Sequence, residues 1–498
     1  MSMLRRLLPS ALLSTLLAAS GAAHAQLPEP VAQLLEAARI PQEAMGAVVL
    51  RNGAPLLMHG AERSMQPAST MKVLTTMVAL EQLGPIFRGR TEMRTSAELV
   101  RGVLRGDLYL RGGADADFNE DVLARMLQEL RNQGIWRIQG NIVLDRQLFQ
   151  PAQPDPHAPP FDEYPYAYYN VVPDALLLNT NLLRLELRAT GSQLAAVMLP
   201  AMDKVALKAD LKLVDAPCAQ WETGWKPPEA VRTDGKINVL LRGTFPRDCS
   251  TSTSINVLDR HDYLERLLRI TWKRLGGVLN GDVREADAAG ATPPTARQLA
   301  AHVSRPLPEL LRDINKQSDN TLARTLYLSL GSLEADSALG SHPLPPAPDS
   351  TAARAEQRIR AWLQERGIAT EGLVLENGSG LSRLERVTPA QLAAVLQAGQ
   401  RSLWMPEFVS SLPIAGLDGT MRKRLKDSPA TLHARLKTGS LRGVVAIAGY
   451  VPDAGGQPCV VVAFINDEHV ANGAGRAVLD ALVDWVARAP QAPALPAR

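Results

Sequence analysis

The chain has 498 residues with 54 basic and 51 acidic side chains, which gives a formal net charge of +3. Because the two signs nearly balance, the composition does not suggest a protein that binds nucleic acid or a charged membrane. The chain is also longer than a typical domain with a single hydrophobic core, so we expect two or more domains.

Residues 1–25 have the pattern of a cleaved secretory signal peptide. Arg5 and Arg6 precede a short apolar stretch, and Ala23-His24-Ala25 forms a small-residue cleavage site. Cleavage removes both arginines and lowers the formal charge from +3 to +1. No later apolar run is long enough to span a bilayer. We therefore expect a soluble periplasmic protein with no transmembrane anchor and no nucleic-acid partner.

The mature chain begins with a predicted helix over residues 30–40 and a predicted β-hairpin over residues 46–60, with Asn52-Gly53 at its turn. The next segment, QPASTMKVLTTMVALEQLGP, covers residues 66–85. Pro67 suits a first helical turn, apolar residues recur at helical spacing, and Gly84-Pro85 is a stop signal. The pattern predicts a helix that starts close to Ser69.

Ser69 and Lys72 are three residues apart and therefore share one face of this predicted helix. Burial disfavours the charged form of a lysine and lowers its pKa, so a buried Lys72 can accept the Ser69 proton near neutral pH. That arrangement describes an activated nucleophile. The alternative is a surface lysine that happens to follow a serine on an amphipathic helix.

Residues 91–290 contain short segments in which apolar and polar residues alternate, a pattern that predicts β-strands. A proline-rich stretch at 151–160 interrupts them. Helical patterns follow at 306–317, 320–331, 352–367 and 388–399, then strands at 433–451 and 458–467 and a final helix at 475–489. The simplest assembly pairs the first hairpin with the last strands in one sheet. It predicts a discontinuous domain of residues 26–90 and 291–488, an inserted β-rich domain at 91–290, and a flexible tail at 489–498.

The three cysteines are too few for a disulfide scaffold. Cys218 and Cys249 could pair across a loop, which the sequence leaves open, whereas Cys459 lies in an apolar run and is expected to be a buried thiol. The spacings match no zinc site and the HExxH motif is absent, so we expect neither a metal nor another cofactor.

Two further motifs could complete a catalytic site with Ser69 and Lys72. Lys437-Thr438-Gly439 ends a predicted strand, where a cation beside a hydroxyl suits a carboxylate and glycine allows a close approach. Ser318-Asp319-Asn320 lies between two predicted helices. Ser254 and Asn256 have the same S-x-N spacing, but they belong to the β-rich block, so we prefer Ser318.

The set S-x-x-K, S-D-N and K-T-G is typical of penicillin-binding proteins and class A β-lactamases. In an exported chain it resembles the acyl-serine penicillin-recognising superfamily. The 246 residues from Lys72 to Ser318 resemble the large insertion of class C penicillin-binding proteins, soluble D-alanyl-D-alanine carboxypeptidases and endopeptidases. Similar blocks stand at 106–118, 314–320, 377–383, 412–425 and 436–451, whereas residues 145–290 fit only loosely.

This resemblance implies an α/β fold of the penicillin-binding transpeptidase and β-lactamase type. An antiparallel sheet flanked by helices would carry a helical subdomain and the large β-rich insertion. The implied catalytic residues are Ser69 as nucleophile, Lys72 as proton acceptor and Ser318 as proton relay. The implied substrate-binding residues are Asn320, Lys437, Thr438, Gly439 and Ser440.

More specific roles follow from the same resemblance. Asn320 would hold Lys72 and the substrate amide, and Lys437 and Thr438 would bind the terminal carboxylate. The backbone N–H groups of Ser69 and Ser440 would form the oxyanion hole. The positive charge of Lys437 would further lower the pKa of Lys72. The GSGLSR block at 378–383 would form a tight glycine turn beneath the site.

The leading functional hypothesis is a serine-type D-Ala-D-Ala carboxypeptidase acting on peptidoglycan stem peptides, with D,D-endopeptidase activity on cross-links as an extension. β-Lactams would be covalent inhibitors. A β-lactamase of the same superfamily needs a carboxylate that activates water, and the class A E-x-x-L-N segment is absent. A non-catalytic cell-wall-binding protein would not need the full polar set. A Ser-His-Asp hydrolase is disfavoured because no G-x-S-x-G segment occurs.

Overall fold

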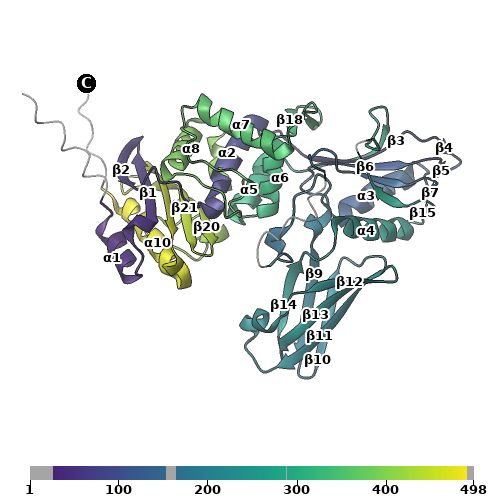
Figure 1. Ribbon diagram of the computed structural model, residues 1–498, viewed down its shortest axis with the longest axis horizontal. Helices are drawn as coiled ribbons and strands as arrows, with labels where there is room; N and C mark the ends of the chain where they lie inside the picture. The colour runs from purple at the N-terminus through teal and green to yellow at the C-terminus, as the bar shows by residue number, and fades with distance from the viewer. Residues whose placement is uncertain (1–25, 153–163, 288, 491–498) are drawn as a thin grey trace, which may run out of the picture.

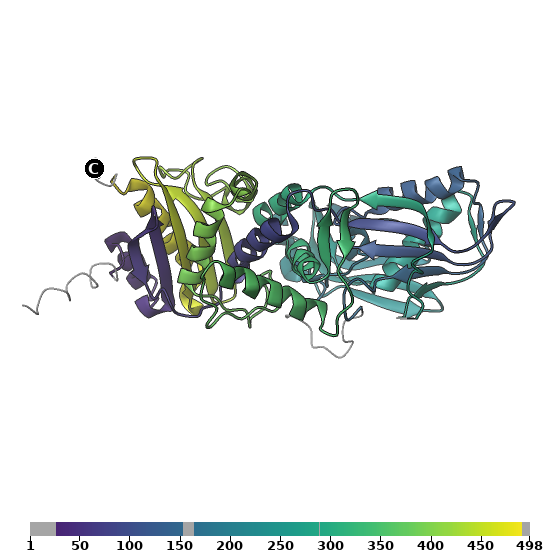
Figure 2. The ribbon, with the colours of Figure 1, turned by 90° about the horizontal axis from the view of Figure 1, so that it is seen from above.

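The computed structural model describes residues 26–152, 164–287 and 289–490. The predicted signal peptide, most of the proline-rich stretch and most of the predicted tail lie outside the described residues. The molecule is elongated, and two parts lie along its long axis (Figure 1). One part contains both ends of the described chain, and the other is formed by the middle of the sequence. Figure 2 shows the same division from above.

The first part is built on a five-stranded antiparallel sheet in the order β2-β1-β22-β21-β20. Its strands are β1 (Met45–Arg51), β2 (Ala54–His59), β20 (Arg435–Leu441), β21 (Val444–Pro452) and β22 (Pro458–Asn466). The predicted pairing of the first hairpin with the last strands is therefore confirmed. Alternate residues of β22 enter two different cores, which explains its continuous apolar sequence.

Helices cover both faces of this sheet. The helices α1 (Glu29–Ala37) and α10 (Ala474–Arg488) pack on one face, and α2 (Met71–Leu83) and α8 (Pro389–Arg401) lie over the other. The remaining helices of this part are α5 (Leu307–Lys316), α6 (Asn320–Leu330), α7 (Thr351–Glu365) and α9 (Met405–Ser411), with a small hairpin of β18 (Leu333–Asp336) and β19 (Gly340–Pro343).

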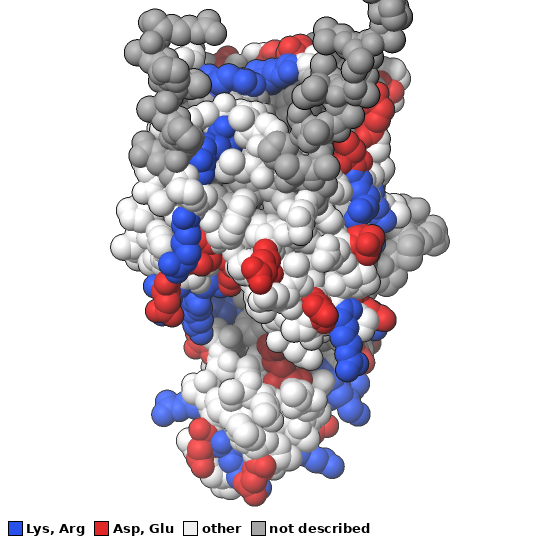
Figure 3. Space-filling model, turned by 90° about the vertical axis from the view of Figure 1, so that its left-hand side faces the viewer, with Lys and Arg blue, Asp and Glu red and all other residues white. Residues whose placement is uncertain are grey.

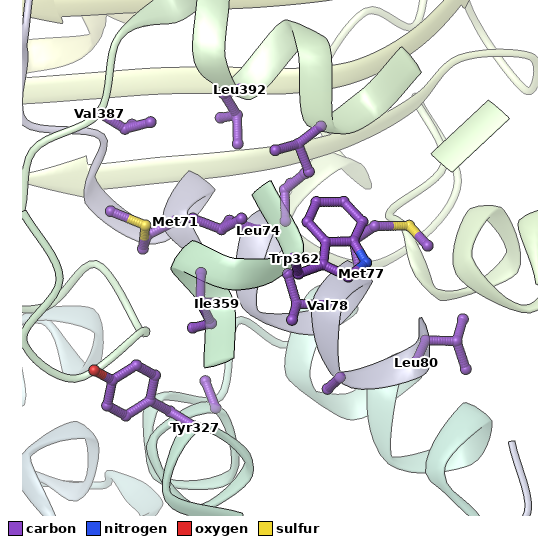
Figure 4. Packing of buried hydrophobic residues seen from close by; sticks show 14 of the residues in the cluster. Met71, Leu74, Met77, Val78, Leu80, Tyr327, Ile359, Trp362, Val387 and Leu392 are labelled. Atoms are coloured by element: carbon purple, nitrogen blue, oxygen red, sulfur yellow. The ribbon is translucent and has the colours of Figure 1, made fainter. Parts of the chain in front are cut away.

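Helix α2 lies at the centre of the helical layer. All of its residues except Glu81 and Gln82 are buried. Figure 4 shows its apolar side chains surrounded by Ile359 and Trp362 of α7 and by Leu392 of α8. Packing on every side fixes the start of this helix, where the Ser69 segment lies, relative to the sheet.

The inserted part contains a five-stranded mixed sheet, β16-β8-β6-β3-β17, and a small four-stranded sheet, β15-β7-β5-β4. The first has β3 (Arg90–Thr95), β6 (Leu108–Gly113), β8 (Ile142–Asp145), β16 (Val283–Glu285) and β17 (Arg297–Val303). The second has β4 (Leu99–Val100), β5 (Val103–Leu104), β7 (Arg137–Ile138) and β15 (Val278–Leu279). Because β17 pairs with β3, the first sheet continues past residue 290.

Two further sheets of the inserted part project away from the long axis (Figure 1). One joins β9 (Leu183–Thr190), β10 (Gln193–Leu199) and β14 (Ser250–Ile255), and the other joins β11 (Val205–Val214), β12 (Glu229–Thr233) and β13 (Lys236–Pro246). A disulfide bond links Cys218 to Cys249 beside these sheets, which settles the pairing that the sequence left open. Cys459 is a buried free thiol, as expected.

The description of residues 91–290 as strands alone was incomplete. This block also contains α3 (Glu120–Asn132) and α4 (Arg260–Arg274), which the sequence analysis did not predict. Helix α3 is capped by the Asn119 side chain, which accepts a hydrogen bond from the Val122 N–H, and its apolar face is buried in the core of the inserted part. The predicted fold class, an α/β protein with a β-rich insertion, is confirmed.

The surface charge agrees with the balanced composition. On the end of the molecule seen in Figure 3, basic and acidic side chains are interspersed among uncharged ones. Within the described residues, no helix is both long enough and apolar enough to cross a membrane.

Candidate active site

Ser69 lies in the short 3-10 turn η2 (Ala68–Thr70), which leads directly into α2. The Lys72 Nζ atom lies 3.1 Å from the Ser69 Oγ atom, and the lysine is 0% exposed. Nζ also donates to the Asn320 Oδ1 atom and to the Ser379 carbonyl, each at 2.6 Å. A neutral amine has two N–H bonds and one lone pair. The two short contacts take the N–H bonds and direct the lone pair at the serine hydroxyl.

Burial lowers the pKa of Lys72 from 10.5 to about 7. The carboxylates of Asp319 and Glu385 oppose this shift, and the nearby guanidinium of Arg324 adds to it. The sequence analysis named burial as a cause, which is confirmed, but it gave the additional lowering to the charge of Lys437, whereas Arg324 supplies it. Lys437 is itself buried, and its pKa is lowered well below the ordinary value by burial and then by the charge of Lys72.

The second and third motifs meet each other beside this pair. The Lys437 Nζ atom, on β20, donates to the Ser318 Oγ atom at 2.8 Å and to the Thr438 carbonyl at 2.8 Å. Ser318 lies between α5 and α6 with a φ of +60°, a strained value for a residue other than glycine. Asn320 begins α6, and its side chain reaches Lys72. All three predicted motifs therefore come together, although long stretches of sequence separate them.

Gly439 lies where β20 passes close to the Ser69 turn. A Cβ atom at this position would stand 2.9 Å from the Ser69 backbone nitrogen and 2.8 Å from the Pro67 carbonyl oxygen. These distances are shorter than side chains normally tolerate, so the expected need for glycine has a direct steric reason. The absence of a side chain lets the strand approach the N–H group that is predicted to bind an oxyanion.

Two open cavities share Ser69, Ser318 and Ser440 in their walls. The first, of about 970 Å³, extends along the end of β20 and below three tyrosines of the inserted part: Tyr164, Tyr168 and Tyr169. The second, of about 720 Å³, extends past Thr438 toward the turn η6 (Gly419–Met421). Ser69 is thus accessible from a cleft with two arms, which could hold an extended peptide with one part on each side of the serine.

Sequence reasoning missed two residues that support Lys72. The Ser379 carbonyl accepts a hydrogen bond from Lys72, and the buried Glu385 carboxylate holds the loop that carries this carbonyl. Glu385 accepts hydrogen bonds from the backbone N–H groups of Asn377, Gly378 and Gly380 at 3.0, 2.7 and 2.7 Å. The glycine turn was predicted. Its contact with Lys72 was not, because every residue has a backbone carbonyl and the sequence does not show which one accepts a hydrogen bond from the lysine.

The rival S-x-N pair has structural contacts instead. Ser254 lies in β14, and the Asn256 Oδ1 atom accepts a hydrogen bond from Asn181 at 2.9 Å. Neither residue lines a cavity that contains Ser69. Asp319 caps α6 by accepting from the Leu322 N–H at 2.9 Å, so its carboxylate is used locally.

A serine held against a buried neutral amine, beside a second lysine and an open cleft, defines an acyl-transferring serine hydrolase. The sequence model of the D-Ala-D-Ala carboxypeptidase 3 (S13) family matches residues 27–489. The chain belongs to this family. The predicted enzyme class, a serine-type D-Ala-D-Ala carboxypeptidase, and the predicted resemblance to class C penicillin-binding proteins are thereby confirmed.

Curated relatives support the assignment over most of the chain. The D-alanyl-D-alanine carboxypeptidase DacB of Haemophilus influenzae is 28% identical over 410 residues, which cover 81% of this chain and 80% of the relative. The D-alanyl-D-alanine carboxypeptidase of Actinomadura sp. (strain R39) is 28% identical over 492 residues, which cover 96% and 88%.

Solved structures agree on the fold. Penicillin binding protein 4 of Haemophilus influenzae superposes with a TM-score of 0.74 at 24% identity and covers 92% of this chain and 99% of its own. The same protein complexed with a novel β-lactam gives a TM-score of 0.70 at 25% identity, with 92% and 98% coverage.

Proposed function

We propose that this protein is a periplasmic enzyme that removes the terminal D-alanine from peptidoglycan stem peptides through an acyl-Ser69 intermediate. The observation that carries the proposal is the contact of the fully buried Lys72 amine with the Ser69 hydroxyl. The signal-peptide pattern of residues 1–25 and the cell-wall chemistry of the family support the location.

In the acylation step, the Ser69 Oγ atom attacks the carbonyl carbon between the two D-alanines while Lys72 takes its proton. The developing negative charge on the carbonyl oxygen is stabilised by the N–H groups of Ser69 and Ser440. Ser318, hydrogen-bonded to Lys437, delivers its proton to the departing amine and regains one from the protonated Lys72, which is then neutral again. The C–N bond breaks, D-alanine leaves, and the rest of the peptide remains as an ester on Ser69.

Substrate orientation depends on the edge of β20. Lys437 and Thr438 bind the terminal carboxylate of the substrate, and Gly439 allows the peptide and the Ser69 turn to lie close to the strand. Asn320 holds the amide of the acyl part while it accepts a hydrogen bond from Lys72. A water molecule, deprotonated by Lys72, then hydrolyses the ester and restores the free serine.

β-Lactams would react with the same serine. After the ring opens, the leaving nitrogen stays attached to the acyl group and remains in the site. It therefore hinders the approach of the water that would hydrolyse the ester, whereas free D-alanine diffuses away. The relative that was solved with a β-lactam supports this proposal. The same chemistry extends to D,D-endopeptidase activity when the departing amine belongs to a second peptide.

We also propose that the inserted domain runs from about residue 90 to about residue 303, since β3 and β17 close one sheet. Its tyrosines Tyr164, Tyr168 and Tyr169 line the first cavity and would contact the acyl part of the substrate. The remainder, from residue 26 to 89 and from 304 to 488, would form the peptidase domain, followed by the tail.

The decisive experiment combines labelled penicillin with peptide turnover. The native protein should be labelled covalently and should release D-alanine from a peptide that ends in D-Ala-D-Ala, whereas Ser69→Ala should do neither. Labelling of Ser69→Ala would end the nucleophile assignment. Rapid β-lactam hydrolysis without D-alanine release would favour a β-lactamase, and the absence of both reactions would favour a non-catalytic wall-binding protein.

A further inference from the structure

The second cavity at the active site is strongly basic. Its wall contains four basic residues and one acid: Arg422, Lys423, Arg424, Arg476 and Asp480. Arg424 and Asp480 form an ion pair at 2.7 Å and neutralise each other. Arg422, Lys423 and Arg476 are exposed, and they form no ion pair within the part of the chain that the structure describes. Three uncompensated positive charges therefore face this arm of the cleft.

The basic segment is fixed beside the catalytic strand. The Asp418 carboxylate accepts hydrogen bonds from the Lys316 ammonium at 2.6 Å and from the Ile414 N–H at 2.8 Å. Two residues further on, the Thr420 Oγ1 atom accepts a hydrogen bond from the Thr438 Oγ1 atom at 2.8 Å. The acid of this turn is thus already neutralised by Lys316, and the Arg422 and Lys423 that follow line the same cavity as Thr438.

The two arms of the cleft extend from Ser69 past different ends of the K-T-G segment. The first extends beyond Ser440 to Leu441 and Arg442, and the second extends beyond Thr438. If Thr438 holds the carboxylate of the departing residue, as the proposed function requires, the departing group occupies the second arm. A free D-alanine is small and has a single carboxylate, whereas this arm has a volume of about 720 Å³ and three further cations.

We propose that Arg422, Lys423 and Arg476 form an anion-binding wall, which recognises carboxylates on the departing strand of a cross-linked stem peptide. The inference rests on the proposed function and names its substrate class. In this reaction the bond from the D-alanine carbonyl carbon to the amine nitrogen of the second strand breaks. Ser69 takes the acyl group, the amine leaves with the serine's proton, and water then hydrolyses the ester.

The test compares two substrates in the purified mature protein. One is a single-chain peptide ending in D-Ala-D-Ala, and the other is a cross-linked dimer of stem peptides. The variant is the triple substitution Arg422→Gln, Lys423→Gln and Arg476→Gln. The control changes three exposed lysines of the projecting sheets in the same way, namely Lys208→Gln, Lys212→Gln and Lys236→Gln.

The wall variant should lower kcat/KM for the dimer about tenfold, mainly through KM, because exposed ion pairs are individually weak but add up over three cations. It should change kcat/KM for the single-chain peptide and the rate of penicillin labelling by less than about twofold. Added salt should reduce dimer cleavage by the native protein and have little effect on the wall variant. A dimer in which the departing-strand carboxylates are amidated, except the one beside the scissile bond that Thr438 holds, should be cleaved equally by both proteins.

Several results would overturn this inference. An equal loss on both substrates would indicate general damage to the site, and an unchanged dimer rate would show that the wall does not bind the departing strand. A native protein that releases D-alanine but does not cut the dimer would remove the inference and leave the proposed function. A native protein that attacks neither substrate would remove both.

Discussion

Gly439→Ala should impair acylation by steric pressure on the oxyanion hole. The added Cβ atom would stand 2.8 Å from the Pro67 oxygen, 2.9 Å from the Ser69 nitrogen and 3.0 Å from the Ala68 Cβ atom. Ordinary contacts of this kind are about 3.5 Å, so strand and turn must separate by roughly 0.5–0.7 Å. Misplacing one oxyanion donor costs about 3 kcal/mol, which corresponds to a rate reduction of roughly 100-fold.

The assay is the second-order rate of labelling by a fluorescent penicillin, followed by D-alanine release under substrate saturation. Gly443→Ala, in the turn that follows β20, is a matched control: its Cβ would meet nothing closer than 3.9 Å, although its φ of +73° makes alanine strained. The control should lose about 1 kcal/mol of stability and acylate within about twofold of the native rate. Native-like acylation by folded Gly439→Ala would refute the steric reasoning.

Three further predictions concern Lys72 and its support. The acylation rate should rise with pH up to about 7 and then level off, because only the neutral amine accepts a proton. Lys72→Met should be inactive. The difference in unfolding free energy between the native protein and this variant should depend on pH. The unfolded lysine keeps its proton up to about 10.5 whereas the folded one loses it near 7, so the native protein gains stability relative to the variant as pH rises through this window. The gain, measured by denaturant unfolding, should be about 2 kcal/mol between about pH 7 and about pH 9. Glu385→Gln should destabilise the fold by about 1–3 kcal/mol, because an NH₂ group would face backbone N–H donors. It should also shift the pH–rate profile to lower pH, since the carboxylate raises the pKa of Lys72.

Each of these predictions has a distinct contrary outcome. A pH–rate profile that keeps rising to about pH 10 would show that the lysine has an ordinary pKa. A stability difference between the native protein and Lys72→Met that does not change with pH would show that the amine is not desolvated. An unchanged profile in Glu385→Gln would show that this carboxylate does not act on Lys72, whatever its effect on stability.

The sequence was most informative where a motif is local. Ser69 and Lys72 meet because residues three apart share a helix face, and Lys437 to Ser440 lie along one strand. Ser318 required a choice between two identical spacings, and its place at a helix junction decided correctly which pair lines the cleft. Helix α3 was not predicted, although the sequence shows its Asn119 cap, its acidic first turn and its apolar positions. The alternating apolar and polar residues on either side of it favoured a prediction of strands.

Other features depend on contacts between distant backbone atoms. The Ser379 carbonyl reaches Lys72 from the loop 376–380, whose backbone is hydrogen-bonded to Glu385 and Thr75, and neither the carbonyl nor the loop geometry follows from residue types. Burial was predicted as the cause of the lower Lys72 pKa and is confirmed, but the contribution of Arg324 was not predicted, because it depends on how α6 packs beside α2. Likewise, the basic wall becomes visible only when Arg476 of α10 is brought next to Arg422.

The most direct measurement of the central idea is an NMR titration of the Lys72 amine in the native protein. Lysine labelled with carbon-13 at the ε position would supply the signal, and Lys72→Arg would assign it. A midpoint near 7 would establish a neutral amine beside Ser69 at the working pH, as burial requires. A midpoint at the ordinary lysine value of about 10.5 would contradict the proposed activation of the serine.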